Sequence, residues 1–262
     1  MRETLESLLA GEISIDQAER LLKTRSMTEV EGATLDIRRE ARTGIPEVIW
    51  AKDKTPAKVV EIASALVEAE GRAIISRTSA EHVKALKDAF PTDRELQLSD
   101  QASLTVVRRR GTQPPHLGRT IGVMTAGTSD IAVAEEARII AQEMGCDVIT
   151  SYDVGIAGFH RHLVPLKEMV DQNVDAIVVV AGMEGALPSV VASLVDVPVI
   201  GVPSSVGYGF GGEGVGALIS MLQSCSPGLC TVNIDNGLGA GAFAALIAKR
   251  AAAARSKGET GT

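Results

Sequence analysis

The chain has 262 residues, of which 45% are hydrophobic, and its formal net charge is −7. That length and apolar content suffice for one large hydrophobic core or two modest ones, so we expect a soluble globular protein. The acidic balance argues against a nucleic-acid surface, because binding to a phosphate backbone depends on clustered Lys and Arg. Small molecules are the expected partners.

The sequence also argues against secretion and against a membrane span. The N-terminus is charged and has helical periodicity, unlike a signal peptide. Acidic residues and prolines break the apolar tract of residues 175–206 into pieces shorter than the ~20 residues that a span needs. The three cysteines, Cys146, Cys225 and Cys230, form no CxxC pair, so neither a zinc site nor a disulfide scaffold is indicated. These features predict a cytoplasmic protein.

Residues 1–30 predict a helical hairpin, because two periodic apolar runs are separated by Gly11. Residues 31–114 predict a small α/β domain, with strands at 47–51, 72–76 and 104–107 and helices at 55–68 and 79–89. Near its start, Arg38, Arg39 and Arg42 allow two interpretations: a solvated face, or a group that holds a carboxylate or phosphate by bidentate contacts.

Three arginines and a pair of prolines mark a linker near residue 115, because that composition sustains neither a helical nor a strand period. Residues 115–256 then alternate regularly between strand and helix, and residues 257–262 predict a disordered tail. The expected strands are 119–124, 147–151, 176–180, 199–202 and 229–234, and the expected helices are 131–144, 163–170, 187–194, 215–224 and 241–253.

Strands such as residues 176–180 are apolar on both faces, as a parallel sheet covered by helices on each side requires. The predicted fold class is therefore α/β, with a five-stranded doubly wound parallel sheet of flavodoxin-like order after a smaller α/β domain. Ligands of such sheets bind beyond the carboxyl ends of the strands. We therefore look for function in the strand-to-helix loops.

The first of these loops, residues 125–130, runs into a helix start, where free amides and the positive dipole end attract anions. Ser129 or Asp130 would explain a simple helix cap. Gly127 beside two hydroxyl groups is more than a cap requires, which favours phosphate binding.

The second loop, residues 152–162, supplies Asp153, His160 and Arg161 as acid, base and anion-binding groups. His160 and His162 have a spacing that could hold a metal on a strand, but no further ligands are evident. Substrate contact is the better interpretation.

The third loop, residues 181–188, places Glu184 directly after a buried strand. An unpaired carboxylate is costly in such surroundings, so we expect Glu184 to take up a proton readily or to have a bound partner. Either state suits a proton-transfer residue, and the alternative is a charge at a helix N-terminus.

The fourth loop, residues 203–214, is so rich in glycine that it could mould its amides around a phosphate or act as a mobile cover. The fifth, residues 233–240, again offers polar groups at a helix start. From all five loops we expect substrate contacts from Gly127, Thr128, Ser129, Asp130, His160, Arg161, Gly182, Met183, Gly209, Gly211, Gly212, Asp235 and Asn236.

Cys225 falls where a helix ends and a Ser-Pro-Gly turn begins, a place where a thiol can be accessible. An accessible thiolate is a nucleophile, whereas most free cysteines simply fill a core. Cys225 shares an edge with the five loops only if the turn after its helix folds back.

Residues 119–255 resemble the catalytic fold of phosphoribosylaminoimidazole carboxylase in the first loop, in the pair His160 and Arg161, and in the third loop, residues 181–188. That purine enzyme lacks the segment 153–158, the N-terminal domain and the Ser-Cys-Ser-Pro-Gly turn. The whole chain resembles the nickel-pincer cofactor biosynthesis family LarB, on residues 38–50, 152–161, 182–188, 207–212, 224–228 and 232–237.

That resemblance implies the first step of nickel-pincer cofactor biosynthesis, which serves lactate racemase activation. Nicotinic acid adenine dinucleotide is carboxylated with CO2 or bicarbonate at the pyridinium C5, and its phosphoanhydride is hydrolysed, giving pyridinium-3,5-biscarboxylic acid mononucleotide and AMP. Cys225 would be the nucleophile and Glu184 or Asp153 the base. Mg²⁺ would assist hydrolysis, although the sequence does not indicate which residues would bind it. The resemblance also implies a homo-oligomer, an octamer.

Two other functions remain open at this point. A purine-pathway aminoimidazole ribotide carboxylase would tolerate Cys225→Ala. A nucleotide-binding sensor without chemistry would give no product with either substrate.

Overall fold

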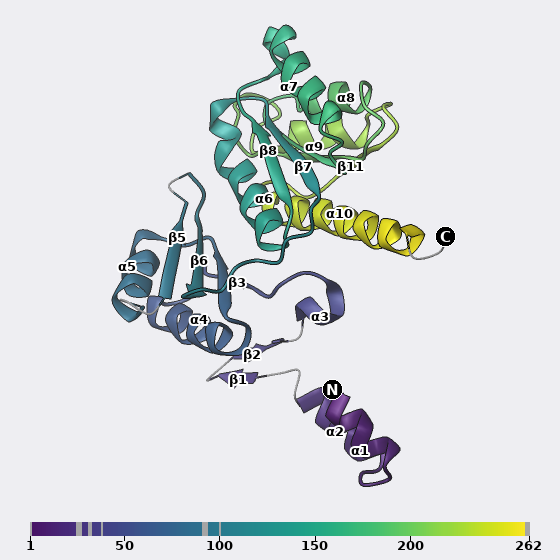
Figure 1. Cartoon of the computed structure of the whole chain (residues 1–262). Coiled ribbons are helices and arrows are strands. Elements are labelled where there is room, and N and C mark those ends of the chain that lie inside the picture. Colours follow the sequence, from purple (N-terminus) through teal and green to yellow (C-terminus); the bar gives the residue numbers. More distant parts are fainter. Residues whose placement is uncertain are drawn as a thin grey trace. The chain divides into compact units, whose positions relative to one another are not determined.

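The computed structural model describes residues 2–24, 28–30, 33–37, 39–90, 94–99 and 101–259 (Figure 1). Arg38, which the sequence groups with Arg39 and Arg42, lies outside these residues, as does the end of the expected tail, 260–262. The chain divides into two compact units. One comprises Met1–Leu98 and Ser103–Thr112, and the other Ser99–Ala102 and Gln113–Thr262.

The first unit begins with the helical hairpin that the sequence predicts, α1 (Arg2–Leu9) and α2 (Ile15–Thr24). Gly11 takes a left-handed φ of 72° in the turn between them, a conformation that glycine adopts at little cost. Two short antiparallel strands, β1 (Thr28–Val30) and β2 (Ala33–Leu35), follow the hairpin.

A four-stranded sheet of order β3-β4-β6-β5 forms the centre of the first unit. Thr55 caps the N-terminus of helix α4 (Pro56–Glu70) by accepting a hydrogen bond from the Lys58 amide, and Gly71 ends that helix with a φ of 79°. The strands are β3 (Val48–Trp50), β4 (Arg72–Ser76), β5 (Arg94–Leu98) and β6 (Leu104–Arg109), and the helices are α3 (Arg39–Thr43), α4 (Pro56–Glu70) and α5 (Ala80–Ala89).

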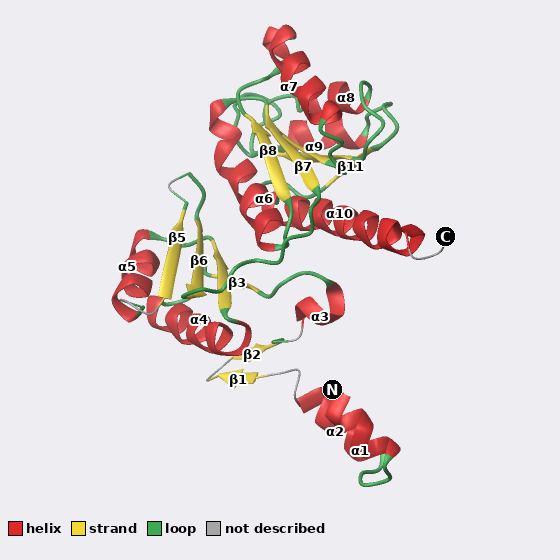
Figure 2. Cartoon of the chain, viewed as in Figure 1, coloured by secondary structure: helices red, strands yellow, loops and turns green. Residues whose placement is uncertain are grey.

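The second unit contains a five-stranded sheet of order β11-β10-β9-β7-β8 in which every pairing is parallel. This confirms the predicted flavodoxin-like order. Figure 2 shows its strands in yellow among the red helices. The strands are β7 (Thr120–Thr125), β8 (Asp147–Ser151), β9 (Ile177–Ala181), β10 (Val199–Pro203) and β11 (Leu229–Thr231).

Helices cover both faces of this sheet. α6 (Ile131–Glu143) and α10 (Gly237–Glu259) pack against each other and against the sheet. The other face has a core built from α7 (His160–Asp171), α8 (Leu187–Ala192) and α9 (Val215–Leu222). α10 continues through Glu259, beyond residue 257 where the sequence predicts a disordered tail.

Two glycines on α10 explain how closely it approaches α6. A Cβ added to Gly237 would lie 1.9 Å from the Val133 carbonyl oxygen, and one added to Gly241 would lie 2.3 Å from that of Ala137. Both distances are far below van der Waals contact, so only glycine fits at these positions. In the described part of the chain, no helix is long and apolar enough to cross a bilayer.

Candidate active site

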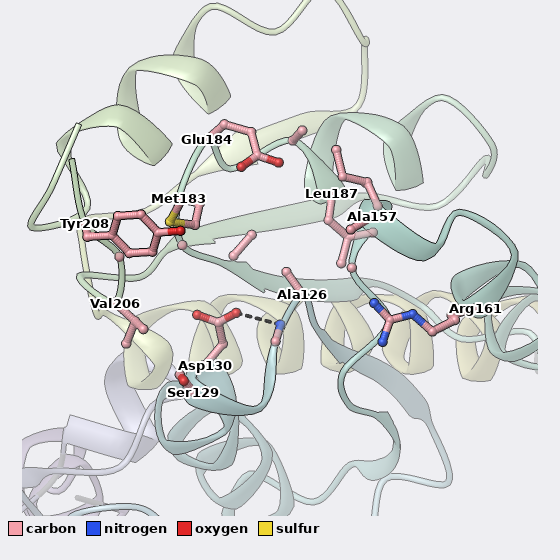
Figure 3. Close-up of a pocket in the computed structure, with 17 residues that line it drawn as sticks. Ala126, Ser129, Asp130, Ala157, Arg161, Met183, Glu184, Leu187, Val206 and Tyr208 are labelled. Carbon is pink, nitrogen blue, oxygen red and sulfur yellow. Dashed lines mark hydrogen bonds between the residues drawn. The ribbon is translucent and has the colours of Figure 1, made fainter. Parts of the chain in front are cut away.

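A cavity of about 730 Å³ opens at the carboxyl ends of the strands in the second unit. Loops that follow β7, β8, β9 and β10 line it, as expected for a doubly wound sheet. Figure 3 shows three charged side chains, Asp130, Arg161 and Glu184, around the hollow from different sides.

Asp130 is the buried carboxylate of this site, with only 4% of its surface exposed. Its Oδ2 accepts a hydrogen bond from the Gly127 amide at 2.9 Å. Burial raises the pKa of Asp130, and hydrogen bonds from Gly127, Ser204 and Gly182 offset part of that rise. One carboxylate therefore ties together the loops that follow β7, β9 and β10.

The burial and hydrogen bond of Asp130 argue against the phosphate site expected in the first loop, residues 125–130. The Asp130 carboxylate occupies the Gly127 amide that we expected to be free for a phosphate. A buried carboxylate also repels an anion. Gly127 and Ser129 line the cavity with Asp130, whereas Thr128 does not.

Glu184 lines the cavity as an exposed side chain. The expectation that burial would act on this carboxylate is therefore wrong. Its neighbours Met183 and Gly185 have positive φ angles of 52° and 61°, so the chain turns sharply after the buried strand β9 and carries Glu184 out to solvent. Strain of this kind, at a non-glycine residue such as Met183, is characteristic of functional loops.

The loops after β9 and β10 touch at Gly182. A Cβ at that position would lie 2.1 Å from the carbonyl oxygen of Val206, so any other residue would push the two loops apart. Gly182 and Met183 both line the cavity, as the sequence predicts.

Arg161 lines the part of the cavity that lies away from Tyr208, next to Ala157 and Leu187 (Figure 3). Its Nη1 donates to the Asp153 carbonyl oxygen at 3.0 Å and to Asp153 Oδ2 at 3.2 Å. The Asp153 amide in turn donates to Thr125 Oγ1 at 3.0 Å. Asp153 does not line the cavity itself, but it contacts Arg161, which does.

Cys225 is exposed, in agreement with the predicted accessibility of its thiol. It lies in the turn between α9 and β11, which leads into the amino end of a strand, whereas the cavity lies at the carboxyl ends. The turn is anchored by Ser226 Oγ, which donates to the Ser189 carbonyl oxygen at 2.8 Å. The structure does not bring Cys225 into the cavity of its own chain.

Several other expected contact residues also lie outside the cavity lining. Asp235 instead supports the rim, because its Oδ1 accepts a hydrogen bond from the Ser205 amide at 2.8 Å. The remaining ones outside the lining are His160, Gly209, Gly211, Gly212 and Asn236.

Leu187, Val206 and Tyr208 also line the cavity, beside the charged groups, although no sequence signal predicted them. Each belongs to a loop that the sequence marks, but an apolar residue in a loop carries no chemical signal of its own. Among the described residues, no three His, Cys, Asp or Glu side chains are grouped so that they could hold a metal ion.

The parallel sheet and the cavity at its carboxyl edge define a doubly wound α/β protein with its ligand site at the usual place for that fold. The family model for AIR carboxylase matches residues 120–258, and that for the LarB/PurE-like N-terminal domain matches residues 27–109. The chain belongs to the LarB family, and its function is of the carboxylase type.

Known proteins resemble the chain over two different lengths. An uncharacterized protein of Methanocaldococcus jannaschii is 44% identical over 254 residues, which cover 95% of this chain and 97% of that protein. An N5-carboxyaminoimidazole ribonucleotide mutase of the same organism is 35% identical over 45% of this chain and 71% of its own length. The mutase of Thermotoga maritima is 32% identical over 48% of this chain and 73% of its own length.

Proposed function

We propose that this protein carboxylates nicotinic acid adenine dinucleotide at the pyridinium C5 and hydrolyses its phosphoanhydride. The products are pyridinium-3,5-biscarboxylic acid mononucleotide and AMP, as in the first step of nickel-pincer cofactor biosynthesis for lactate racemase. The observation that carries the proposal is that Glu184 and Arg161 line one cavity in a chain of the LarB family. Arg161 offers a guanidinium for the nicotinate carboxylate or a phosphate.

The ring chemistry needs a nucleophile and a base. A pyridinium ring is electron-poor, so its carbon attacks CO2 only after a nucleophile adds and converts the ring to an enamine. In our proposal the Cys225 thiolate adds, and the C5 carbon then forms the new bond to CO2. A base removes the C5 proton, and the thiolate leaves with the electron pair of its C–S bond as aromaticity returns.

Glu184 is the base that the geometry favours. Its carboxylate is exposed at the cavity, whereas the Asp153 carboxylate lies outside the lining and is paired with Arg161. Asp153 then has a positioning role, because it keeps the Arg161 guanidinium at the cavity wall. No step of this proposal is routed through a metal ion.

We further propose that Cys225 reaches the substrate from a second copy of the chain, in a homo-oligomer such as the octamer that the family resemblance implies. The apolar face of α9 that precedes it supports this proposal. Val215, Ile219 and Leu222 recur at helical spacing and are 48%, 51% and 66% exposed. Large apolar side chains in a row on a helix are typical of a subunit contact.

The test is mass spectrometry of the purified protein with nicotinic acid adenine dinucleotide and labelled bicarbonate. We expect a labelled carboxylated mononucleotide together with AMP. The absence of both products would reject the proposed function. A cytoplasmic location belongs to the same proposal, because a reducing compartment keeps the Cys225 thiol free.

The similarity to N5-carboxyaminoimidazole ribonucleotide mutases supports a second candidate, a purine-pathway carboxylase. It predicts conversion of aminoimidazole ribotide, and it predicts that Cys225→Ala retains activity. The same mass-spectrometric assay with that substrate separates the two functions. A binding protein without chemistry would give no product in either assay.

A further inference from the structure

One wall of the cavity is apolar and unusually exposed. Met183, Val206 and Tyr208 line it, and they are 45%, 40% and 82% exposed. Figure 3 shows the Tyr208 ring beside Met183, with its hydroxyl group directed toward the hollow. Large apolar side chains that are exposed to water inside a cavity are typical of a site that a flat group of the ligand covers.

The charges around the cavity are distributed unevenly. In Figure 3 the carboxylates of Asp130 and Glu184 flank the hollow from below and above, while the Arg161 guanidinium lies on the side away from Tyr208. The Tyr208 side of the cavity therefore favours a cation, and the far side favours an anion. A flat cationic ring that carries a negative substituent matches this pattern.

Tyr208 lies between two glycines of the loop that follows β10. Gly207 packs against Met183, because a Cβ there would lie 3.3 Å from the Met183 amide nitrogen. On the other side, Gly209 has a φ of 83° and open space around it. Farther along, the Gly212 amide donates to the Gly209 carbonyl oxygen at 3.2 Å, and the Gly216 amide donates to that of Gly211 at 3.0 Å.

We propose that Tyr208 is a specificity-determining residue whose ring face stacks on the cationic pyridinium ring of the substrate. This inference rests on the proposed function and deepens it. The electron-rich face of an aromatic ring attracts a cation, and the attraction is stronger where water is excluded. Tyr208 thereby selects the charged, oxidised ring over a neutral ring of the same shape.

The test compares two ligands that differ by one hydride, which neutralises the ring: nicotinic acid adenine dinucleotide and its dihydropyridine form, made by dithionite reduction. Titration calorimetry in CO2-depleted buffer gives both dissociation constants for the full-length protein carrying Cys225→Ser, which leaves the ligand ring unmodified. The ratio of the two constants is the readout, because a partly unfolded variant changes both constants alike.

We expect Tyr208→Leu to reduce the preference for the cationic ring by roughly three- to thirty-fold. Tyr208→Phe should keep the preference, since it keeps the ring face. Phe210→Leu is the matched control, because Phe210 is an exposed aromatic residue of the same loop that does not line the cavity.

An unchanged ratio in Tyr208→Leu would overturn the inference alone, and so would a loss in Tyr208→Phe equal to that in Tyr208→Leu. Absence of any binding of nicotinic acid adenine dinucleotide to the protein with Tyr208 intact would overturn the proposed function together with it. A loss of preference in Phe210→Leu as large as in Tyr208→Leu would also contradict the assignment.

Discussion

His162 is fully buried in the first turn of α7, and neither of its ring nitrogens has a hydrogen-bond partner among the residues that the structure describes. The ring of Phe159 packs edge-on against it, with the ring centroids 4.6 Å apart. Burial lowers the pKa of His162, so the folded protein holds the neutral ring. An unpaired polar group in such a place costs stability.

This burial predicts how stability depends on pH. In the unfolded chain His162 takes up a proton near its ordinary pKa of 6.5, whereas in the folded protein burial opposes protonation. Protonation therefore favours the unfolded state, and the free energy of unfolding decreases as the pH falls below 6.5. His162→Phe should remove that dependence and raise the free energy of unfolding by about 1–3 kcal/mol. Urea unfolding at neutral and mildly acidic pH measures both effects.

The exposed His160, two residues away, is the matched control. His160→Gln should leave the pH dependence as it is. If His162→Phe unfolds with the same pH dependence as the unmodified protein, buried His162 is not its source.

Glu184 and Asp153 make a second pair for comparison at the residue scale. Glu184→Gln should lower kcat by about 10²–10⁴ with little change in KM, because it removes the proposed base and keeps the shape of the cavity. Asp153→Asn should mainly raise KM, because it loosens Arg161. Steady-state kinetics of both variants checks this division, and the reverse pattern would make Asp153 the base.

At the scale of elements, the contact between α6 and α10 depends on the glycines of α10. Gly241→Ala gains helix propensity, but the new Cβ would meet the Ala137 backbone. We expect the steric clash to outweigh the gain in helix propensity and to lower the free energy of unfolding by about 1–3 kcal/mol. Chemical denaturation with circular dichroism measures this difference.

Lys249→Ala on the same helix is the control, because it also places an alanine on α10 but at an exposed position. Its stability should stay close to that of the unmodified protein. Equal stability of the Gly241→Ala and unmodified proteins would mean that the two helices separate without cost.

At the scale of the whole molecule, the distance of Cys225 from its own cavity leads to a prediction about assembly. Cys225→Ser and Glu184→Gln should each be inactive when expressed alone. Co-expressed with different affinity tags and purified through both, they should recover about a quarter of the activity, the statistical share of sites that receive both intact residues. An assay of the proposed reaction measures the recovery.

The doubly tagged assembly of Cys225→Ser with itself is the control and should stay inactive. No recovery in the mixed assembly, with an active unmodified protein, would mean that Cys225 serves the cavity of its own chain after a rearrangement. Recovery in the Cys225→Ser control would mean that the thiol is dispensable.

Local patterns sufficed for much of the fold. The apolar strands β9 and β10 and helix α8 between them follow from hydrophobic periodicity, since strands buried on both faces of a parallel sheet are apolar throughout. Strand β5, with the sequence Arg-Glu-Leu-Gln-Leu, was missed because a short and partly charged edge strand leaves little apolar signal. Helix α3 was missed because none of its residues is buried.

The residues of the candidate site were also predictable only in part from local sequence. Loop composition was enough to predict Gly127, Asp130, Arg161, Met183 and Glu184 as residues of one edge, since the carboxyl ends of parallel strands meet there. Only the tertiary structure decided that Asp130 is buried while Glu184 is exposed, and that Tyr208 lines the cavity while Cys225 does not. Burial and facing depend on contacts between loops that lie far apart in the chain, and no local pattern encodes them.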